Sequence, residues 1–246
     1  MLELNTIHLG DSYELLKKYE IHNNAILVID PPYNVNYKYN SYKDNLSMKE
    51  YIEKMKEITS YFKQFVIINY PENLYHLSIK LKKAPTKVVS WVYNSNNARQ
   101  HRDIAFYGIE PNFEAVRQPY KNLNDKRIQE RIANGSGGGR LYDWWKINQV
   151  KNVSSEKYNH PCQIPIKVML NIIGILPKES VIYDVFSGSG TTCIACKELE
   201  RKFVGIEIDP LYHQISLDRL NGITANGQMS IFTDVDKLEQ LTIGVD

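Results

Sequence analysis

The chain has 246 residues, of which 43% are hydrophobic and 24% charged, as in most globular proteins with a buried core. Thirty Lys and Arg residues against 28 Asp and Glu residues leave a net charge of +2, which excludes a polyelectrolyte and a protein that binds nucleic acid through bulk charge alone. This length indicates one domain, or at most two.

Short apolar runs alternate with helical patterns along the chain, which indicates an α/β protein. Five runs of five or six residues are typical of buried parallel strands: Ala25–Ile29, Phe65–Asn69, Lys87–Val92, Val181–Val185 and Phe203–Ile208. The helical patterns lie between them, at Ser47–Phe62, Pro71–Lys82, Ile164–Ile175, Thr191–Glu200 and Pro210–Leu220. We therefore predict a doubly wound, mostly parallel sheet, which binds ligands beyond the carboxyl ends of its strands.

The stretch from Asn94 to Tyr158 interrupts this alternation, because it has few apolar runs and contains a glycine-rich segment at Asn134–Gly139. Between Arg117 and Lys151 lie eight Lys and Arg residues and three Asp and Glu residues, so this part carries +5 (8 minus 3). The rest of the chain therefore carries −3 (2 minus 5). This local excess favours an inserted DNA-binding segment, with a solvated surface loop as the alternative.

A glycine-rich motif, Asp184–Thr192 (DVFSGSGTT), follows a predicted strand and opens a predicted helix. Glycines allow a tight turn and a close approach to a ligand, and the helix N-terminus offers free N–H groups. Glu207 ends the next strand, 19 residues after Gly188, where a carboxylate can accept hydrogen bonds from a ribose. The pair predicts an adenosine-containing cofactor, although a structural turn without ligand is also open.

A second motif, Asp30–Tyr33 (DPPY), stands where the first long apolar strand ends. The two prolines fix the backbone, so the Asp30 carboxylate and the Pro31 carbonyl would form two neighbouring acceptors beside the Tyr33 ring. Such a group could hold a planar ring through its exocyclic amino group. A simple strand-ending turn is the other interpretation.

Together, DPPY and DVFSGSGTT resemble motifs of the amino-group DNA methyltransferases that use S-adenosylmethionine. DPPY comes first and the glycine-rich motif last, with the basic segment between them, an order typical of the beta class found in restriction-modification systems. Gly10-Asp11, His160–Pro165 (HPCQIP) and Arg201–Glu207 resemble further motifs of the family, so that the resemblance covers most of the chain. It implies a Rossmann-like methyltransferase fold with a circularly permuted motif order.

This resemblance divides the chain into four parts. Residues 1–94 would form the catalytic half and residues 159–221 the cofactor-binding half. Residues 95–158 would be the variable target-recognition segment, and residues 222–246 a C-terminal tail.

The family assigns the cofactor to one set of residues in this chain. Asp11 would meet the adenine and Glu207 the ribose, while Asp30 and Asp184 could bind the ammonium group. The remaining cofactor contacts implied by the resemblance are Phe186, Gly188, Gly190, Thr191, Thr192, His160 and Gln163. Ile164 departs from the family, whose box usually has Lys there, so a cationic contact is missing or comes from elsewhere.

The family's chemistry also transfers to the DPPY motif. The target base would flip out of duplex DNA, because it cannot be reached inside the helix. Its amino group would meet the catalytic residues Asp30, Pro31, Pro32 and Tyr33. DPPY favours adenine-N6 as the target. Cytosine-N4 methylation, an RNA or small-molecule methyltransferase and an inactive DNA-binding module are the alternatives.

Contacts to double-stranded DNA are expected from basic residues after the third strand and within the insert. These are Arg99, His101, Arg102, Arg127, Arg131, Arg140 and Lys146. The polar segment Asn34–Asn45 could act as a lid that orders on substrate binding, or could be a plain flexible loop. Monomer and homodimer are both open.

The three cysteines do not form a disulfide framework, and we expect a cytoplasmic protein without a signal peptide or membrane span. Pro161-Cys162 mimics the nucleophile of cytosine-C5 methyltransferases, but the motif order and DPPY argue against that role. Cys193 and Cys196 favour core packing over zinc, and we expect no metal. Gln228–Phe232 resembles a peptide that docks on the sliding clamp, although a small edge strand is favoured.

Overall fold

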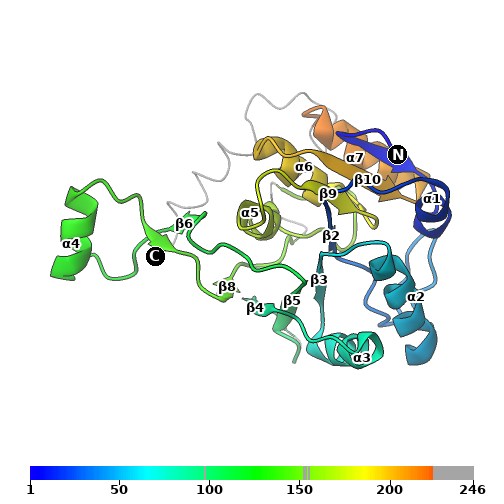
Figure 1. Ribbon diagram of the computed structural model, residues 1–246, viewed down its shortest axis with the longest axis horizontal. Helices are drawn as coiled ribbons and strands as arrows, with labels where there is room; N and C mark the ends of the chain where they lie inside the picture. The colour runs from blue at the N-terminus through cyan, green and yellow to red at the C-terminus, as the bar shows by residue number, and fades with distance from the viewer. Residues whose placement is uncertain (97, 152–153, 155, 224–246) are drawn as a thin grey trace.

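The computed structural model describes residues 1–96, 98–151, 154 and 156–223, and within them eight strands form one large sheet (Figure 1). The strand order, from one edge to the other, is β1 (Thr6–Leu9), β10 (Phe203–Glu207), β9 (Val181–Asp184), β2 (Ala25–Ile29), β3 (Phe65–Asn69), β5 (His101–Tyr107), β4 (Lys87–Val92) and β8 (Trp144–Lys146).

The strands are parallel except β5, which is antiparallel to both β3 and β4. The mostly parallel α/β sheet expected from the sequence is thus confirmed. Because β1, β10, β9, β2, β3 and β4 all run in the same direction, their carboxyl ends meet at one edge of the sheet. The antiparallel β5 begins at that edge, so its first residues join the same region.

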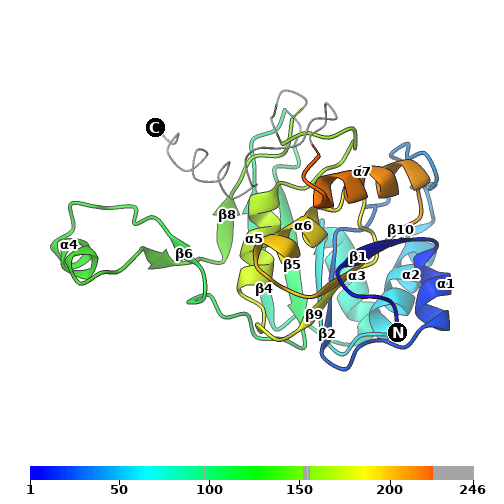
Figure 2. The same cartoon turned by 90° about the horizontal axis from the view of Figure 1, so that it is seen from above.

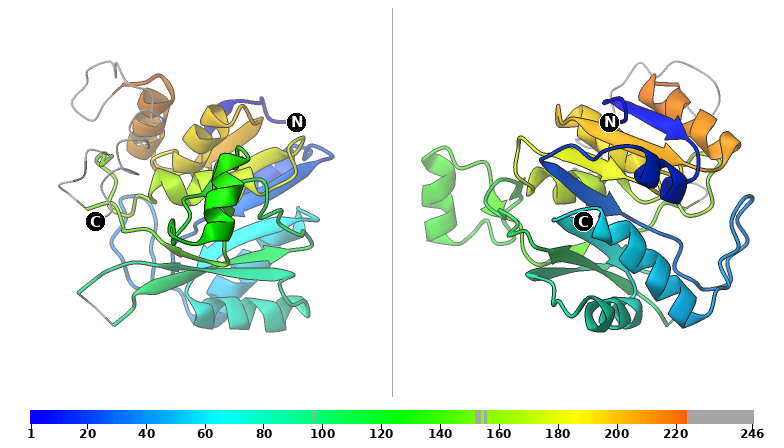
Figure 3. Two further views of the ribbon diagram at one scale, coloured as in Figure 1. Left: turned by 90° about the vertical axis from the view of Figure 1, so that its left-hand side faces the viewer. Right: turned by 45° about the vertical axis from the view of Figure 1, so that its right-hand side comes forward.

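Helices cover both faces of the sheet (Figures 1 and 3). The helices α1 (Ser12–Lys18), α2 (Met48–Ser60) and α3 (Pro71–Leu81) lie on one face, and α5 (Ile166–Gly174), α6 (Thr191–Glu198) and α7 (Pro210–Leu220) lie on the other. Alternate residues of β2 supply the two cores: Ile26 and Val28 pack with α5 and α6, and Leu27 and Ile29 with α2 and α3. The sheet is therefore doubly wound.

Local sequence signals account for the ends of several helices. The hydroxyl of Ser47 caps α2 and Glu50 returns a hydrogen bond, a reciprocal capping box. Pro71 and Pro210 occupy the first positions of α3 and α7, where the missing N–H is no loss. These signals place the helices close to the predicted ranges.

Two strands of the sheet were assigned by the sequence analysis to the target-recognition segment. The structure corrects this, because β5 and β8 pair within the main sheet, and Ile104–Tyr107 of β5 are fully buried. The polar start of β5 and its antiparallel direction hide it from a search for parallel strands. The boundary of the sheet domain therefore lies well beyond residue 95.

The part of the chain that leaves the sheet domain is smaller. It consists of the two-stranded ribbon β6 (Arg117–Gln118) and β7 (Gly139–Arg140) and of the helix α4 (Lys126–Ala133) between them. We call residues 117–140 the arm. Figure 2 shows it projecting away from the sheet, and none of the residues of α4 is buried.

No helix among the described residues is long and apolar enough to cross a membrane. The segment Gln228–Phe232, considered above as a clamp-binding peptide, lies outside the described residues.

Candidate active site

A cavity of about 340 Å³ opens at the carboxyl edge of the sheet. Its walls come from the turns after β1, β2, β9 and β10 and from the segment that follows the DPPY motif. Of the residues predicted to be catalytic or to bind the cofactor, all but Gly190 line it: Asp11, Asp30, Pro31, Pro32, Tyr33, His160, Gln163, Asp184, Phe186, Gly188, Thr191, Thr192 and Glu207. Motifs from both halves of the chain thus share one cavity.

The glycine-rich turn between β9 and α6 is shaped by two left-handed glycines. Gly188 has φ +52°, and a Cβ there would lie 2.8 Å from Nε2 of His160. Gly190 has φ +78°, and its Cβ would lie 2.8 Å from the Cβ of Ser216 in α7. Gly188 therefore keeps the cavity open, whereas Gly190 allows helix packing behind it.

Arg219 of α7 supports this turn from behind, which the sequence did not indicate. Its Nη1 donates to the carbonyl of Ser189 at 2.7 Å and to Oγ1 of Thr191 at 2.9 Å. The guanidinium also lies 4.7 Å from the centre of the Tyr158 ring. A single Arg in the last turn of a helix carries no sequence signal for such a role.

Asp184 ends β9 inside the cavity wall, where its Oδ1 accepts from the backbone N–H of Phe186 at 3.0 Å. Burial, together with the nearby Asp30 and Glu207 carboxylates, raises the pKa of Asp184 to about 7, although hydrogen bonds from Thr192 and from the backbone of Phe186 lower it. A buried carboxyl group of this kind gains most from a cationic ligand.

Glu207 ends β10, two strands away from Asp30. Its carboxylate accepts from the N–H groups of Gly188 at 2.6 Å and of Asp209 at 2.8 Å, and burial raises its pKa. Each oxygen keeps a lone pair for a further donor. Asp11, at the other side of the cavity, caps α1 through the N–H of Tyr13 at 2.8 Å.

Buried asparagines hold the DPPY motif in place. Asn73 donates to the carbonyl of Tyr33 at 3.0 Å and to Oδ1 of Asn69 at 2.8 Å, and Asn69 donates to the hydroxyl of Tyr51 at 2.7 Å. The sequence analysis missed these three residues. The sequence signal that could have indicated this role is Asn69, a polar residue at the end of the apolar strand β3.

Within the motif, the Tyr33 hydroxyl donates to Oδ1 of Asp30, and Oδ2 can accept from an incoming donor. Burial raises the pKa of Asp30 to about 6, while the Arg102 guanidinium and the hydrogen bond from Tyr33 lower it. Asp30 is therefore ionised only above mildly acidic pH.

Arg102 does not lie on an open surface, contrary to what a DNA contact would require. It is partly buried, and its guanidinium carbon lies 4.5 Å from the centre of the Tyr33 ring. The reason is the antiparallel direction of β5, which brings its second residue to the carboxyl edge of the sheet. The sequence analysis places this residue after the third predicted strand, as an expected DNA contact.

The segment Asn34–Asn45 forms a hydrogen-bonded hairpin, with a bridge between Lys38 and Lys43. The buried Asp44 carboxylate accepts from three backbone N–H groups, those of Asn34, Val35 and Tyr37, at 2.7 to 3.0 Å. At the tip, the hydroxyl of Ser41 donates to Oδ2 of Asp209 at 2.6 Å. The hairpin thus covers one side of the cavity and is fastened to the N-terminus of α7.

His160 and Gln163 differ in what their side chains can offer a ligand. Burial lowers the pKa of His160 to about 4, so its ring is neutral, and Nδ1 is buried without a hydrogen-bond partner. The Gln163 amide donates to the carbonyl of Glu156 at 2.6 Å and accepts from the N–H of Tyr158 at 2.9 Å, which holds its own loop together.

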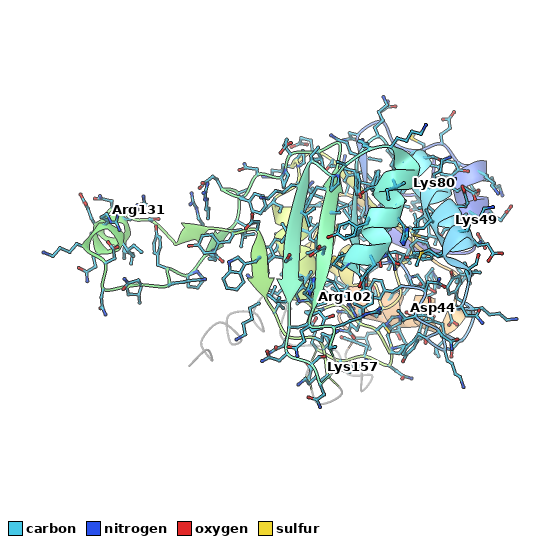
Figure 4. All side chains as sticks on the ribbon, turned by 90° about the horizontal axis from the view of Figure 1, so that it is seen from below. Asp44, Lys49, Lys80, Arg102, Arg131 and Lys157 are labelled. Carbon is cyan, nitrogen blue, oxygen red and sulfur yellow. The ribbon has the colours of Figure 1, made fainter. Side chains whose placement is uncertain are left out.

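The other predicted DNA contacts are all exposed: Arg99, His101, Arg127, Arg131, Arg140 and Lys146. Arg127 and Arg131 are on α4, and Figure 4 shows Arg131 far out on the arm, away from Arg102. Arg140 lies at the base of the arm, within 3.6 Å of Glu114.

The cysteines lie in two different environments. Cys193 and Cys196 are buried in the core against α5 and β9, and Cys162 is partly exposed at the cavity wall. Within the described part of the chain, no group of three His, Cys, Asp or Glu side chains could hold a metal ion.

The fold and the site define a class of protein. A doubly wound sheet carries a glycine-rich turn and an acidic strand end on one side and a DPPY turn on the other, the arrangement of an amino-group methyltransferase. The sequence profile of the DNA methylase family, which covers the N6 and N4 enzymes, matches residues 55–218. The chain belongs to this family, whose enzymes take their methyl group from S-adenosylmethionine.

Named relatives agree with this assignment. The chain is 25% identical to the type II methyltransferase M.HpaI of Haemophilus parainfluenzae, over 86% of this chain and 73% of the relative. It is 27% identical to the DNA adenine methyltransferase YhdJ of Escherichia coli K12, over 89% and 83%.

Among solved structures, the PvuII cytosine-N4-specific DNA methyltransferase is similar with a TM-score of 0.65 at 15% identity, over 97% of this chain and 93% of the other. The M1.HpyAVI complex with S-adenosylmethionine is similar with a TM-score of 0.55 at 24% identity, over 87% and 98%. These structures share the fold.

Proposed function

We propose that this DNA methyltransferase moves the methyl group of S-adenosylmethionine to N6 of a flipped-out adenine in double-stranded DNA at a specific site. One observation carries the proposal: the DPPY turn and the glycine-rich turn line the same cavity. Acceptors for an amino group and a binding site for a charged donor therefore share one cavity, as transfer between two bound molecules requires.

The residues of the cavity fit S-adenosylmethionine. Two buried carboxyl groups, Asp184 and Asp30, suit its ammonium group, and Glu207 suits the ribose hydroxyls. Phe186 and the half-exposed Ile208, which the sequence analysis did not single out, offer apolar surface for the adenine. Asp11 is available to the adenine amino group.

The mechanism assigns each step to this chain's own residues. Oδ2 of Asp30 and the Pro31 carbonyl accept from the target amino group, which fixes the lone pair of its nitrogen toward the donor. S-adenosylmethionine supplies a methyl group on a sulfonium, which goes to that nitrogen and leaves a neutral thioether. The nitrogen loses one proton to Asp30, whose pKa of about 6 allows it to release the proton to water.

Adenine is favoured over cytosine because the motif begins with Asp and because the relative YhdJ is named an adenine methyltransferase. The type II relative M.HpaI supports a place in a restriction-modification system. Cytosine-N4 methylation is the second candidate, since PvuII methyltransferase has the same fold.

The experiment is transfer of a labelled methyl group to duplex DNA from a methylation-free host, followed by nucleoside analysis. N6-methyladenine is the expected product, and N4-methylcytosine would favour the second candidate. Sequencing that reads modified bases would give the recognition site. A protein that binds the cofactor and transfers nothing would contradict the proposal.

Asp30→Ala should lower kcat at least about a thousandfold, because the target amino group loses its charged acceptor. S-adenosylmethionine affinity should fall less, since Asp184 and Glu207 stay in place. Cys162→Ser, a change at the same cavity wall, is the control and should keep most of the activity. An active Asp30→Ala enzyme would refute the assignment.

A further inference from the structure

Arg102 places a cation next to the DPPY motif, and this residue lies outside the motifs that the chain shares with its family. Arg102 enters from the antiparallel strand β5, opposite Trp91 of β4 in the sheet register. Figure 4 shows it near the end of the strands, on the side of the molecule that carries the hairpin residue Asp44.

Four aromatic rings surround its guanidinium group. The guanidinium carbon lies 4.5 Å from the centre of the Tyr33 ring and 5.1 Å from that of Trp91. Tyr93 follows at 5.6 Å and Tyr70 at 5.9 Å. Such a cage fixes a planar cation and, through it, the ring of Tyr33.

The Arg102 charge also acts on Asp30. It is the strongest influence against burial on that carboxyl group, ahead of the hydrogen bond from Tyr33. In return, Tyr33, Asp30, Tyr93 and Tyr70 raise the pKa of Arg102 against the effect of burial, so the guanidinium stays charged. Its Nε atom is buried and has no hydrogen-bond partner.

We propose that Arg102 is a positioning residue for methyl transfer, which holds the Tyr33 ring from one side and keeps the Asp30 carboxylate ionised at neutral pH. This rests on the proposed function of Asp30 as the acceptor of the target amino group. Arg102 is not one of the residues that line the cavity, whereas Asp30 and Tyr33 are, so it would act through these two residues.

The other titratable groups around Asp30 limit what else could set its charge. The charge of Asp30 raises the pKa of four neighbouring groups, and each of these groups is neutral or negative. They are Tyr39 of the hairpin, Tyr51 of α2, Cys162 and Asp184. Within the described residues, Arg102 is the only cation whose charge lowers the pKa of Asp30. Removing its charge should therefore raise the pKa of Asp30, because only the hydrogen bond from Tyr33 would then counteract the effect of burial.

The test compares two substitutions of Arg102, one that removes the charge and one that keeps it. Arg102→Gln removes it, and Arg102→Lys keeps it but loses the planar stack on Tyr33. Arg99→Gln is the matched control, since Arg99 also stacks on a ring (4.5 Å from Tyr70) but is exposed. Thermal unfolding and equilibrium binding of S-adenosylhomocysteine establish that each variant is folded.

The first readout is the acid limb of the kcat/KM profile. In Arg102→Gln the limb should move up by about one pH unit or more, so that a tenfold or larger loss at pH 6.5 recovers largely at pH 8.5. Arg102→Lys should keep the limb near that of the wild type. A loss that is the same at every pH, or only a raised KM for DNA, would make Arg102 a DNA contact and overturn the proposal.

The second readout does not need activity. Carboxyl ¹³C NMR of aspartate-labelled protein, with Asp30→Asn to assign the signal, gives the titration midpoint of Asp30 directly. It should rise in Arg102→Gln and stay in Arg99→Gln, and an unchanged midpoint would overturn the proposal. If the wild type transfers no methyl group while the midpoint still moves, the proposed function fails and the electrostatic role of Arg102 stands.

Discussion

Asp184 and Asp30 are carboxyl groups at the ends of the neighbouring strands β9 and β2, and the charge of Asp30 raises the pKa of Asp184. Without a bound cation, ionising both costs free energy in a medium of low dielectric. Without a cationic ligand, the protonated form of Asp184 is therefore favoured up to about pH 7. A ligand with an ammonium group would reverse this preference.

This gives a prediction for stability against pH in the absence of cofactor. The pKa of Asp184 is raised from 3.8 to about 7, so its contribution to the free energy of unfolding is present below pH 4 and is lost as pH rises through 7. Urea unfolding of the wild type should show a decline between pH 5 and pH 8 that exceeds the decline in Asp184→Asn by about 1 kcal/mol or more. Equal declines would mean that Asp184 is ionised in the free protein.

At the scale of single elements, the sequence predicts those strands whose signal is local. The bounds of β2, β3 and β4 agree with the prediction, because each is a mostly apolar run between polar or proline-containing turns. Strand β5 lacks this signal: its first three residues, His101–Asp103, are polar, and only pairing with β3 and β4 determines its direction.

The residues of the site also fall into two groups, those that a local sequence motif indicates and those that it does not. Residues within contiguous motifs, such as Asp30 and Glu207, were predicted to lie at the cavity and do line it. Arg102, Arg219 and Asn73 act through partners 28 to 69 positions away in sequence, so no local pattern indicates them. Their roles depend on the packing of the whole sheet.

The hairpin 34–45 is held at its tip by a hydrogen bond from Ser41 to Asp209, beside a second side-chain hydrogen bond between Asn40 and the same carboxylate. Ser41→Ala removes this bond while Asp44 continues to organise the base of the hairpin. A hydrogen bond to a carboxylate contributes about 1 kcal/mol or more, so S-adenosylhomocysteine should dissociate about fivefold faster. Stopped-flow displacement measures this rate.

Ser60→Ala is the control for that experiment, since the Ser60 hydroxyl bonds only to the carbonyl of Glu57 in its own helix. It should leave the dissociation rate unchanged. An unchanged rate in Ser41→Ala would mean that the hairpin does not limit the exit of the product.

At the scale of the whole molecule, charge is distributed unevenly. The segment Arg117–Lys151 carries +5 while the remainder carries −3, and the arm holds Arg127 and Arg131 at full exposure. A nearly neutral total is thus compatible with DNA as partner, because a local positive surface can approach phosphates even where the rest of the chain carries no positive excess.

We expect the double substitution Arg127→Glu and Arg131→Glu to weaken duplex DNA binding at least about tenfold and to reduce its salt dependence by about two counterions. Lys49→Glu with Lys56→Glu, on the exposed face of α2, changes the net charge by the same amount and is the control. Fluorescence anisotropy across a salt series measures both. Equal losses would show that total charge, rather than the arm, governs binding.

The base of the arm has a consequence for how such a protein can diversify. Arg117 pairs with Arg140 and Gln118 with Gly139, so the chain leaves the sheet domain and returns to it at adjacent points. No residue of α4 is buried, so its replacement would not disturb either core. A segment of different length and sequence could therefore replace the arm in a relative, while the sheet domain and its catalytic residues stay unchanged.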